Sequence, residues 1–105
     1  MPRPKGSLGE TKLKILAIIC FNERCNEHSY GYNVWLKLKE KFHCYMNDGG
    51  LRNVYHHLES LYRLGLIMKN GNVKVNGAPP RMTYVLTESG KALKDKYEKY
   101  LKLLM

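Results

Sequence analysis

The segment GGLRNVYHHLESLYRLGLI, residues 49–67, combines a helical apolar repeat with polar side chains that can read nucleic-acid bases. Between the apolar positions stand Arg52, whose guanidinium can donate two hydrogen bonds to guanine, and Asn53, whose amide can pair with adenine. The pattern fits either a solvated helix face or a helix that lies against DNA. The apolar residues keep the i, i+3, i+4, i+7 spacing of a buried stripe: Leu51, Val54, Leu58, Leu61 and Tyr62.

Other polar residues of this segment are able to reach phosphates or base edges: His56, His57, Ser60 and Arg63. A single acid, Glu59, opposes them, which favours contact with an anion over a purely solvated face. Arg63 stands near the end of the helix and could instead complement the negative end of its dipole. The two histidines are neighbours, so they point about 100° apart and are poorly placed to share a metal ion. We therefore expect no metal here.

The charge balance of the chain favours a polyanionic partner. Its 105 residues carry 18 basic and 9 acidic side chains, a formal net charge of +9. Such a field attracts nucleic acid or, less often, an anionic membrane surface, although simple solubility would also explain it. The longest apolar run, residues 15–21, is too short to span a bilayer, and the start of the chain lacks a signal-peptide cleavage pattern. We expect a cytoplasmic protein without a membrane partner.

The cysteines and the other titratable residues do not form a recognisable catalytic or cofactor site. Cys20, Cys25 and Cys44 are odd in number, and the spacing of Cys20, Cys25 and His28 matches no compact zinc pattern. Cys20 continues an apolar helix face, where a free cysteine packs as a small hydrophobe. The chain has no paired carboxylates suited to acid–base chemistry, no nucleophile with a histidine and no phosphate-binding glycine loop. We expect neither an enzyme nor a bound cofactor.

The segments before residue 49 predict a tail and two helices. Residues 1–7 form a basic, proline-containing tail that is expected to be flexible. A first helix over 8–24 could be capped by Ser7, with Glu10 completing a capping box. Its apolar residues cover most of the circumference, so it needs cover on more than one side. A second helix is expected over 29–42, with these residues facing inward: Tyr32, Trp35, Leu36 and Leu38.

The remaining chain predicts a third helix, a hairpin and a last helix. The third helix, 51–64, is expected to begin after Asp48 or Gly50 as cap and to end at Gly65. Alternating residues in 66–75 and 81–86, separated by NGAPP, indicate a β-hairpin. Thr87 is the natural N-cap of the last helix.

This order predicts a mainly α fold with a small β-hairpin, a winged helix-turn-helix. Residues 8–86 would form the DNA-binding domain and residues 87–105 a C-terminal dimerisation helix. In this architecture the third helix enters the major groove of double-stranded DNA, and the wing, 70–81, lies on the backbone or in a minor groove. The basic residues expected on the wing side are Lys69, Lys74 and Arg81. Pro79 and Pro80 stiffen the loop that carries Arg81, which makes it the best wing contact.

Four motifs in order give the chain a resemblance to the PadR family of transcriptional regulators, particularly its small, single-domain members. TKLKILAII looks like the family's opening helix, and SYGYNV resembles its HGYEI. NVYHHLESLYRLGLI is similar to TLYPALRRLEEEGLI, and RMTYVLTESG to RKYYRLTEAG. The resemblance covers about residues 8–104. It departs at NDGGL, where the family commonly has a Ser-Pro-like cap, and at His56, which stands where the family often has proline.

The resemblance implies a homodimeric DNA-binding repressor, with the first and last helices forming the dimer. Tyr55 matches a family tyrosine that often contacts the DNA backbone, and Arg81 matches its basic wing residue. Some members bind small molecules in the dimer cleft, so an effector remains open here, although Tyr97 and Tyr100 are more simply packing residues. The residues expected at the dimer interface are Leu13, Ile15, Ile19, Leu93, Tyr97, Tyr100, Leu101 and Leu104.

The sequence thus favours a sequence-specific transcriptional regulator, a homodimeric repressor that reads a pseudo-palindromic operator. The residues expected at the DNA are Arg52, Asn53, Tyr55, His56, His57, Ser60, Lys69, Lys74 and Arg81. Two alternatives use the same fold: a chromatin or architectural protein that binds DNA without sequence choice, and an adaptor that binds another protein. The ratio of specific to non-specific affinity at physiological salt separates the sequence-specific regulator from the architectural protein.

Overall fold

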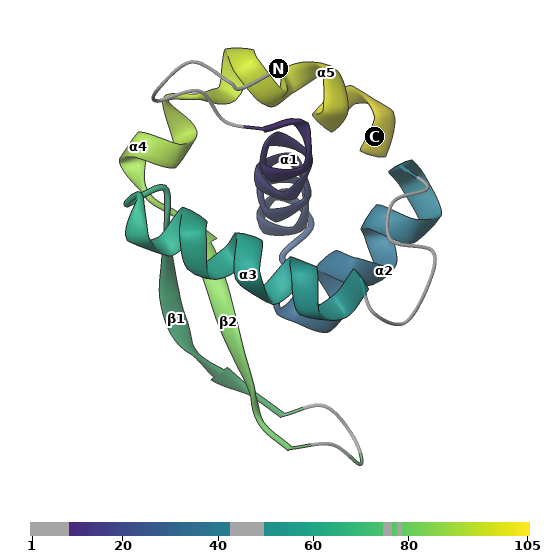
Figure 1. Cartoon of the computed structure of the whole chain (residues 1–105), viewed down its shortest axis with the longest axis vertical. Helices are drawn as coiled ribbons and strands as arrows, with labels where there is room; N and C mark the ends of the chain where they lie inside the picture. Colours follow the sequence, from purple (N-terminus) through teal and green to yellow (C-terminus); the bar gives the residue numbers. More distant parts are fainter. Residues whose placement is uncertain (1–8, 43–49, 75–76, 78) are drawn as a thin grey trace.

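A central helix surrounded by the other helices, with a hairpin that extends away from them, forms the molecule (Figure 1). The computed structural model describes residues 9–42, 50–74, 77 and 79–105. The elements, in chain order, are α1 (Glu10–Arg24), α2 (Gly31–Phe42), α3 (Gly50–Arg63), β1 (Ile67–Val73), β2 (Arg81–Leu86), α4 (Glu88–Lys91) and α5 (Lys94–Leu104). The predicted mainly α winged helix-turn-helix is confirmed.

Helix α1 is the centre of the core because its apolar residues are covered on several sides. Residues 15–19, the sequence ILAII, are all fully buried, and α5, β2 and α2 pack around the helix. The helix begins after Gly9, which provides no side-chain hydrogen bond; the expected cap, Ser7, lies outside the described residues. The prediction that α1 needs cover on more than one side is confirmed.

Two polar contacts fasten the end of α1 to the hairpin side of the molecule. Asn22 is fully buried, and its Nδ2 donates a hydrogen bond to the Ser29 hydroxyl at 3.0 Å. The Glu23 carboxylate accepts a hydrogen bond from the backbone N–H of Leu86 at 3.0 Å. A hydrogen bond that satisfies a part-buried donor stabilises the fold, since an unpaired buried N–H is costly. These contacts fix the root of β2 against the central helix.

Helix α2 begins two residues later than expected because Ser29 makes an isolated β-bridge with Tyr84. The carbonyl oxygen of Ser29 accepts the N–H of Tyr84 at 2.8 Å, which makes a short bridge beside β2. Trp35 and Leu38 are buried as predicted, and Leu36 is half-buried. The inward placement of Tyr32 was wrong, since 39% of its surface is exposed. Tyr32 lies at the rim, where its ring contacts the Trp35 ring and the Arg81 guanidinium.

Helix α3 has the predicted buried stripe with one exception. Val54, Leu58 and Leu61 are fully buried, and Leu51 is half-buried. Tyr62 was expected inside but is 40% exposed. Gly65 follows the helix with φ +77, the left-handed conformation that glycine adopts at low cost. The region of Asp48, one of the two expected caps, lies outside the described residues, and Gly50 is the first residue of the helix.

The hairpin is a two-stranded antiparallel sheet with a bulge. Ile67 pairs with Leu86 and Val73 with Arg81, and the register shifts between Lys69 and Asn72. Gly71 in the bulge has φ +79, and the hydroxyl of buried Thr83 shares its proton between the carbonyl oxygens of Asn70 and Gly71, at 3.0 and 2.9 Å. A bulge bends a strand and increases its twist, so this contact sets the direction of the wing.

The junction between β2 and α4 is held by Thr87 and Gly90. The Thr87 hydroxyl donates to the Gly65 carbonyl at 2.6 Å and accepts the N–H of Gly90 at 3.2 Å, which confirms the predicted N-cap. The backbone N–H of Thr87 also donates to the carbonyl of Leu66 at 3.1 Å. Gly90 lies directly on this strand start, and a Cβ there would overlap the Leu66 carbonyl oxygen.

The prediction of a single last helix is wrong. The chain forms the short α4, turns at Ala92 and Leu93, and continues as α5. Helix α4 is held at the hairpin by Gly90, whereas α5 crosses α1 (Figure 1). One straight helix would not make both contacts, which explains the break.

Most of the residues expected at the dimer interface pack inside a single chain. The exceptions are Leu13 and Leu93, which are half-buried. Because side chains buried within one chain offer little or no surface to a second copy, α5 itself provides the cover that we expected from a partner. The six buried residues are Ile15, Ile19, Tyr97, Tyr100, Leu101 and Leu104. For Tyr97, burial together with the nearby Cys20 thiol raises the pKa of the phenol.

Replacement of Gly90 by alanine should destabilise the fold. The added methyl group meets a backbone carbonyl, which cannot move without disturbing the hairpin start, so we expect Gly90→Ala to lower the free energy of unfolding by about 1–3 kcal/mol. Urea denaturation monitored by circular dichroism measures this free energy of unfolding. The exposed neighbour Ser89 supplies the control Ser89→Ala, and equal midpoints for the two variants would contradict this account of the junction.

Candidate nucleic-acid interface

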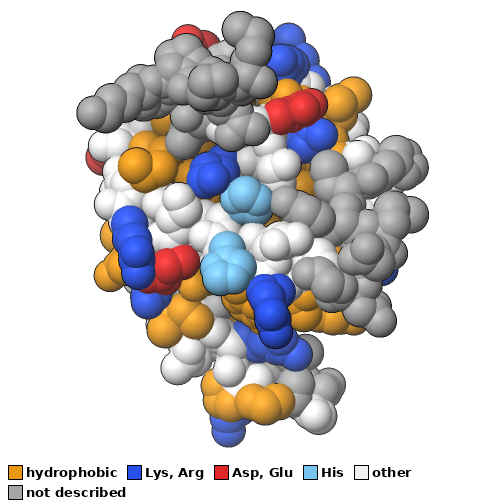
Figure 2. Space-filling view, viewed as in Figure 1, with side chains coloured by type: hydrophobic (Ala, Val, Ile, Leu, Met, Phe, Trp, Pro, Cys, Tyr) orange, Lys and Arg blue, Asp and Glu red, His pale blue; other side chains and the backbone are white. Residues whose placement is uncertain are grey.

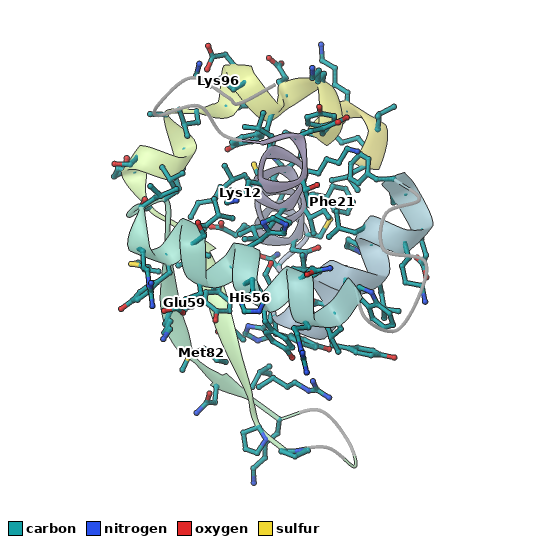
Figure 3. The ribbon with its side chains drawn as sticks, in the orientation of Figure 1. Lys12, Phe21, His56, Glu59, Met82 and Lys96 are labelled. Atoms are coloured by element: carbon teal, nitrogen blue, oxygen red, sulfur yellow. The ribbon has the colours of Figure 1, made fainter. Side chains whose placement is uncertain are left out.

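The outward face of α3 carries the residues that the sequence predicted for base contact. Arg52, Asn53 and His56 are exposed, and in the described part of the chain their side chains make no hydrogen bond or ion pair with another residue. His57 and Ser60 are half-buried. Figure 3 shows His56 and Glu59 together on this helix, beside the hairpin strand that bears Met82. Three side chains able to hydrogen-bond with bases are therefore available on one helix.

In the second half of α3, two charged side chains form an ion pair with each other. Arg63 Nε lies 3.5 Å from Glu59 Oε1, an ion pair one helical turn apart. Both side chains are largely exposed, so the pair adds little stability. These two residues line a shallow depression of about 330 Å³ together with His56, Ser60 and Leu64. The Glu59 carboxylate here weakens the positive field of Arg63, so Arg52 and Asn53 are the better candidates for contact with bases.

Tyr55 contacts the beginning of α2 rather than pointing freely outward. Its ring lies so close to Gly31 that a Cβ at that position would overlap three of the ring atoms. The glycine of the SYGYNV motif is thus required by a close approach between α2 and α3. The motif was visible in the sequence, but its physical reason depends on the packing of two helices that are separated along the chain.

Tyr84, on β2, lines the same region as Tyr55. It is 9% exposed, and burial is the main cause that raises the pKa of its phenol, followed by the negative charge of Glu59 and then by Tyr55. A raised pKa keeps the hydroxyl protonated at neutral pH, since even the ordinary tyrosine pKa is about 10. The hairpin therefore presents a neutral hydroxyl, not an anion, to the α3 side.

The three basic wing residues occupy different places. Lys69 lies at the root of the hairpin, where its Nζ is 4.7 Å from the centre of the Tyr62 ring. Lys74 is exposed just beyond β1. Arg81 begins β2 and packs against α2, with its guanidinium carbon 6.0 Å from the Tyr30 ring and 5.5 Å from the Tyr32 ring. The structure thus joins Arg81 to two tyrosines that sequence reasoning did not include in the site.

A hollow of about 270 Å³ separates the start of α2 from the wing. Aromatic and proline side chains dominate its lining, and Arg81 supplies the charge. The signal that could have revealed it is the YGY sequence of residues 30–32, in which two tyrosines flank the glycine that allows close packing. The lining residues are Tyr30, Gly31, Tyr55, Pro79, Pro80, Arg81, Met82 and Tyr84.

Among the charged side chains on the face that contains α3 and the wing, basic ones predominate (Figure 2). Histidine side chains lie over α3, Lys and Arg side chains surround them and continue along the hairpin, and acidic side chains are fewer (Figure 2). Because charges of one sign on one face add their fields, this face attracts an anionic surface.

Other kinds of site are not found in the described residues. Residues 9–42, 50–74, 77 and 79–105 contain no group of three or more histidine, cysteine or acidic side chains able to hold a metal ion. Cys20 and Cys25 are free thiols, and Cys44 lies outside these ranges. Within the same ranges every helix is too short or too polar to span a lipid bilayer.

Solved structures of regulators share this fold. The chain is similar to Bacillus subtilis PadR in complex with operator DNA, with 20% identity, a TM-score of 0.62 and coverage of 90% of this chain and 48% of that one. It therefore spans about half the length of that protein. H. salinarum RosR matches with 24% identity and a TM-score of 0.61 over 94% of this chain and 79% of its own. A PadR-like transcriptional regulator from Bacillus cereus matches with 22% identity and a TM-score of 0.60 over 89% and 82%.

A comparison of the amino-acid sequence with protein-family models identifies the family of this chain. A comparison with curated proteins gave no match. The model of the transcriptional regulator PadR-like family, however, matches residues 15–96, from the middle of α1 into α5. This match covers most of the chain and confirms the resemblance that the sequence motifs indicated, so the chain belongs to the transcriptional regulator PadR-like family.

Proposed function

We propose that the protein is a sequence-specific DNA-binding regulator that places α3 in the major groove of a pseudo-palindromic operator. The observation that carries this proposal is the outward face of α3, with the side chains of Arg52, Asn53 and His56 exposed and unpaired among the described residues. Arginine and asparagine make the bidentate contacts that distinguish guanine and adenine. The family membership and the basic face support the same function.

The wing would contact the DNA backbone beside the groove. Lys69, Lys74 and Arg81 all belong to the hairpin or its flanks, and phosphate contacts of this kind set affinity and register without reading bases. Tyr55, His57 and Ser60 lie at the edge of the α3 face and are proposed as further backbone contacts. The outward face of α3 would then supply the sequence discrimination.

The proposed regulator acts as a homodimer and as a repressor. Two recognition helices about 34 Å apart would meet two half-sites one helical turn apart. Six of the residues that we expected at the dimer interface are buried inside the chain, so a second copy would use what is left exposed on α5 and its neighbours, including Leu103 and the half-buried Leu93. Repression follows if the operator overlaps a promoter.

The proposal is tested by selection from a random DNA library at about 150 mM salt. Enrichment of a palindrome with half-sites about 10 base pairs apart, with a dimer in analytical ultracentrifugation, would support it. Binding without enrichment would indicate an architectural protein that ignores sequence, and no binding would indicate a protein partner.

Truncation of the two base readers should relax sequence choice. We expect Arg52→Ala and Asn53→Ala each to weaken binding to the selected site by about 1–3 kcal/mol while binding to unrelated duplexes changes little. Fluorescence anisotropy with both kinds of duplex measures the specificity ratio. Lys96, on the opposite side of the molecule in Figure 3, supplies the control Lys96→Ala. An equal decrease in affinity for both duplexes would show that these residues do not read bases.

Removal of a wing charge should act on all sequences alike. If Lys74 binds a phosphate, Lys74→Gln weakens binding to specific and unrelated duplexes by the same factor. The slope of log affinity against log salt should also become shallower by about 0.9 for each phosphate that the variant no longer neutralises. Binding titrations between low and physiological salt give this slope. A change confined to the selected sequence would assign Lys74 to base recognition instead.

A further inference from the structure

Two aromatic rings of α2, with a cation at each end, form a row that leads from Lys39 to Arg81 at the loop end of β2. Lys39 Nζ lies 4.2 Å from the centre of the Trp35 ring, and the Trp35 and Tyr32 ring centres are 5.6 Å apart, with their planes tilted by 53°. The Arg81 guanidinium follows, 5.5 Å from the Tyr32 ring. Residues 32, 35 and 39 share one helix face because they are spaced by three and four positions. The wing residue Arg81 therefore continues a stack that begins on α2.

Arg81 is held in place but is not neutralised. Tyr30 contributes a second ring, 6.0 Å from the guanidinium carbon. Arg81 Nε is buried and lacks a hydrogen-bond partner among the described residues. The described residues that line the neighbouring hollow include no carboxylate. A cation without an acidic partner keeps its capacity to bind an anion, and its remaining donors are available for one.

Beside the Tyr30 and Tyr32 rings, arginine is better suited than lysine to position 81. A guanidinium stacks flat on an aromatic face and offers a planar fork of donors that matches phosphate oxygens, whereas the lysine ammonium is a point charge on a flexible stem. Stacking also restricts the rotamers of a long side chain, so less entropy is lost when an anion binds. The stack thus prepares the guanidinium before any ligand arrives.

We propose that Tyr30 and Tyr32 are positioning residues that hold the Arg81 guanidinium for one phosphate of the DNA backbone. The loop end of β2 is thereby held against the start of α2, next to the hollow where the Tyr55 ring meets Gly31. This inference rests on the proposed function in that its ligand is DNA, but it does not depend on sequence preference, because phosphate contacts form on every duplex.

The test is a double-mutant cycle on a fluorescein-labelled duplex of mixed sequence. Arg81→Gln should weaken binding about tenfold or more and make the salt slope shallower by about 0.9. The paired change Tyr30→Leu/Tyr32→Leu should weaken binding about 2–5-fold for each ring that is removed. In the Arg81→Gln background the same leucine pair should have no further effect, since the rings then have no guanidinium to hold.

Conservative variants separate positioning from other roles. Tyr30→Phe/Tyr32→Phe retains both rings and should bind as the wild type does, whereas Arg81→Lys retains the charge and the salt slope but binds more weakly. The emission of Trp35, the only tryptophan of the chain, together with the urea midpoint, shows whether each variant is folded. Lys96→Gln on α5 is the matched control for removal of one charge, because α5 crosses α1 away from the wing (Figure 3).

Four outcomes would overturn the inference. Equal weakening by the leucine pair with and without Arg81 would show that the tyrosines act only through the fold. Weakening by the phenylalanine pair would assign the role to the hydroxyl groups. If the wild-type protein binds DNA and Arg81→Gln binds equally well, Arg81 is not part of the interface, and the proposed function is unaffected. If the wild-type protein does not bind DNA at all, both the inference and the proposed function are overturned.

Discussion

The complete burial of α1 is the constraint on which the rest of the structure depends. Five consecutive apolar residues, 15–19, have no exposed surface, and a helix that is apolar around its circumference must be surrounded. In a chain of this size nearly every other element is needed for that cover. Helices α2 and α3 pack on one part, α5 crosses another, and Glu23 at the end of α1 binds the backbone of β2. The orientation of α3 and of the hairpin is therefore set by the core.

The same arrangement separates two sides of the molecule. α3 and the hairpin present a basic face, while α5 lies across α1 away from the wing (Figure 1 and Figure 2). The stripe of α3 that is inserted into the core leaves Arg52 and Asn53 on the surface. Helix packing thus provides the rigid support that the proposed contact with bases would need, since small displacements break hydrogen bonds.

Close contacts between backbone and ring atoms join α2, α3 and the wing, the three parts of the candidate interface. Gly31 lets the Tyr55 ring of α3 lie on the start of α2, and Gly90 lets α4 lie on the strand start. The Tyr32 ring then meets Arg81 from the wing. Each contact joins segments that are distant in the chain, and each requires a residue of a particular size. The helix, the wing and α2 therefore form one surface.

The order of the elements, the buried stripe of α3, the cap at Thr87 and the family could be predicted from the sequence, because local periodicity and turn residues encode them. Tertiary structure decided what the sequence predicted wrongly or did not include: Tyr32 and Tyr62 lie at the surface, the last helix breaks at Ala92 and Leu93, and the Arg81 guanidinium lies near the Tyr30 and Tyr32 rings. A residue pattern indicates which face of a helix is apolar, but not which element covers it. That choice depends on contacts between distant segments, and it explains why side chains expected at a dimer interface lie inside a single chain.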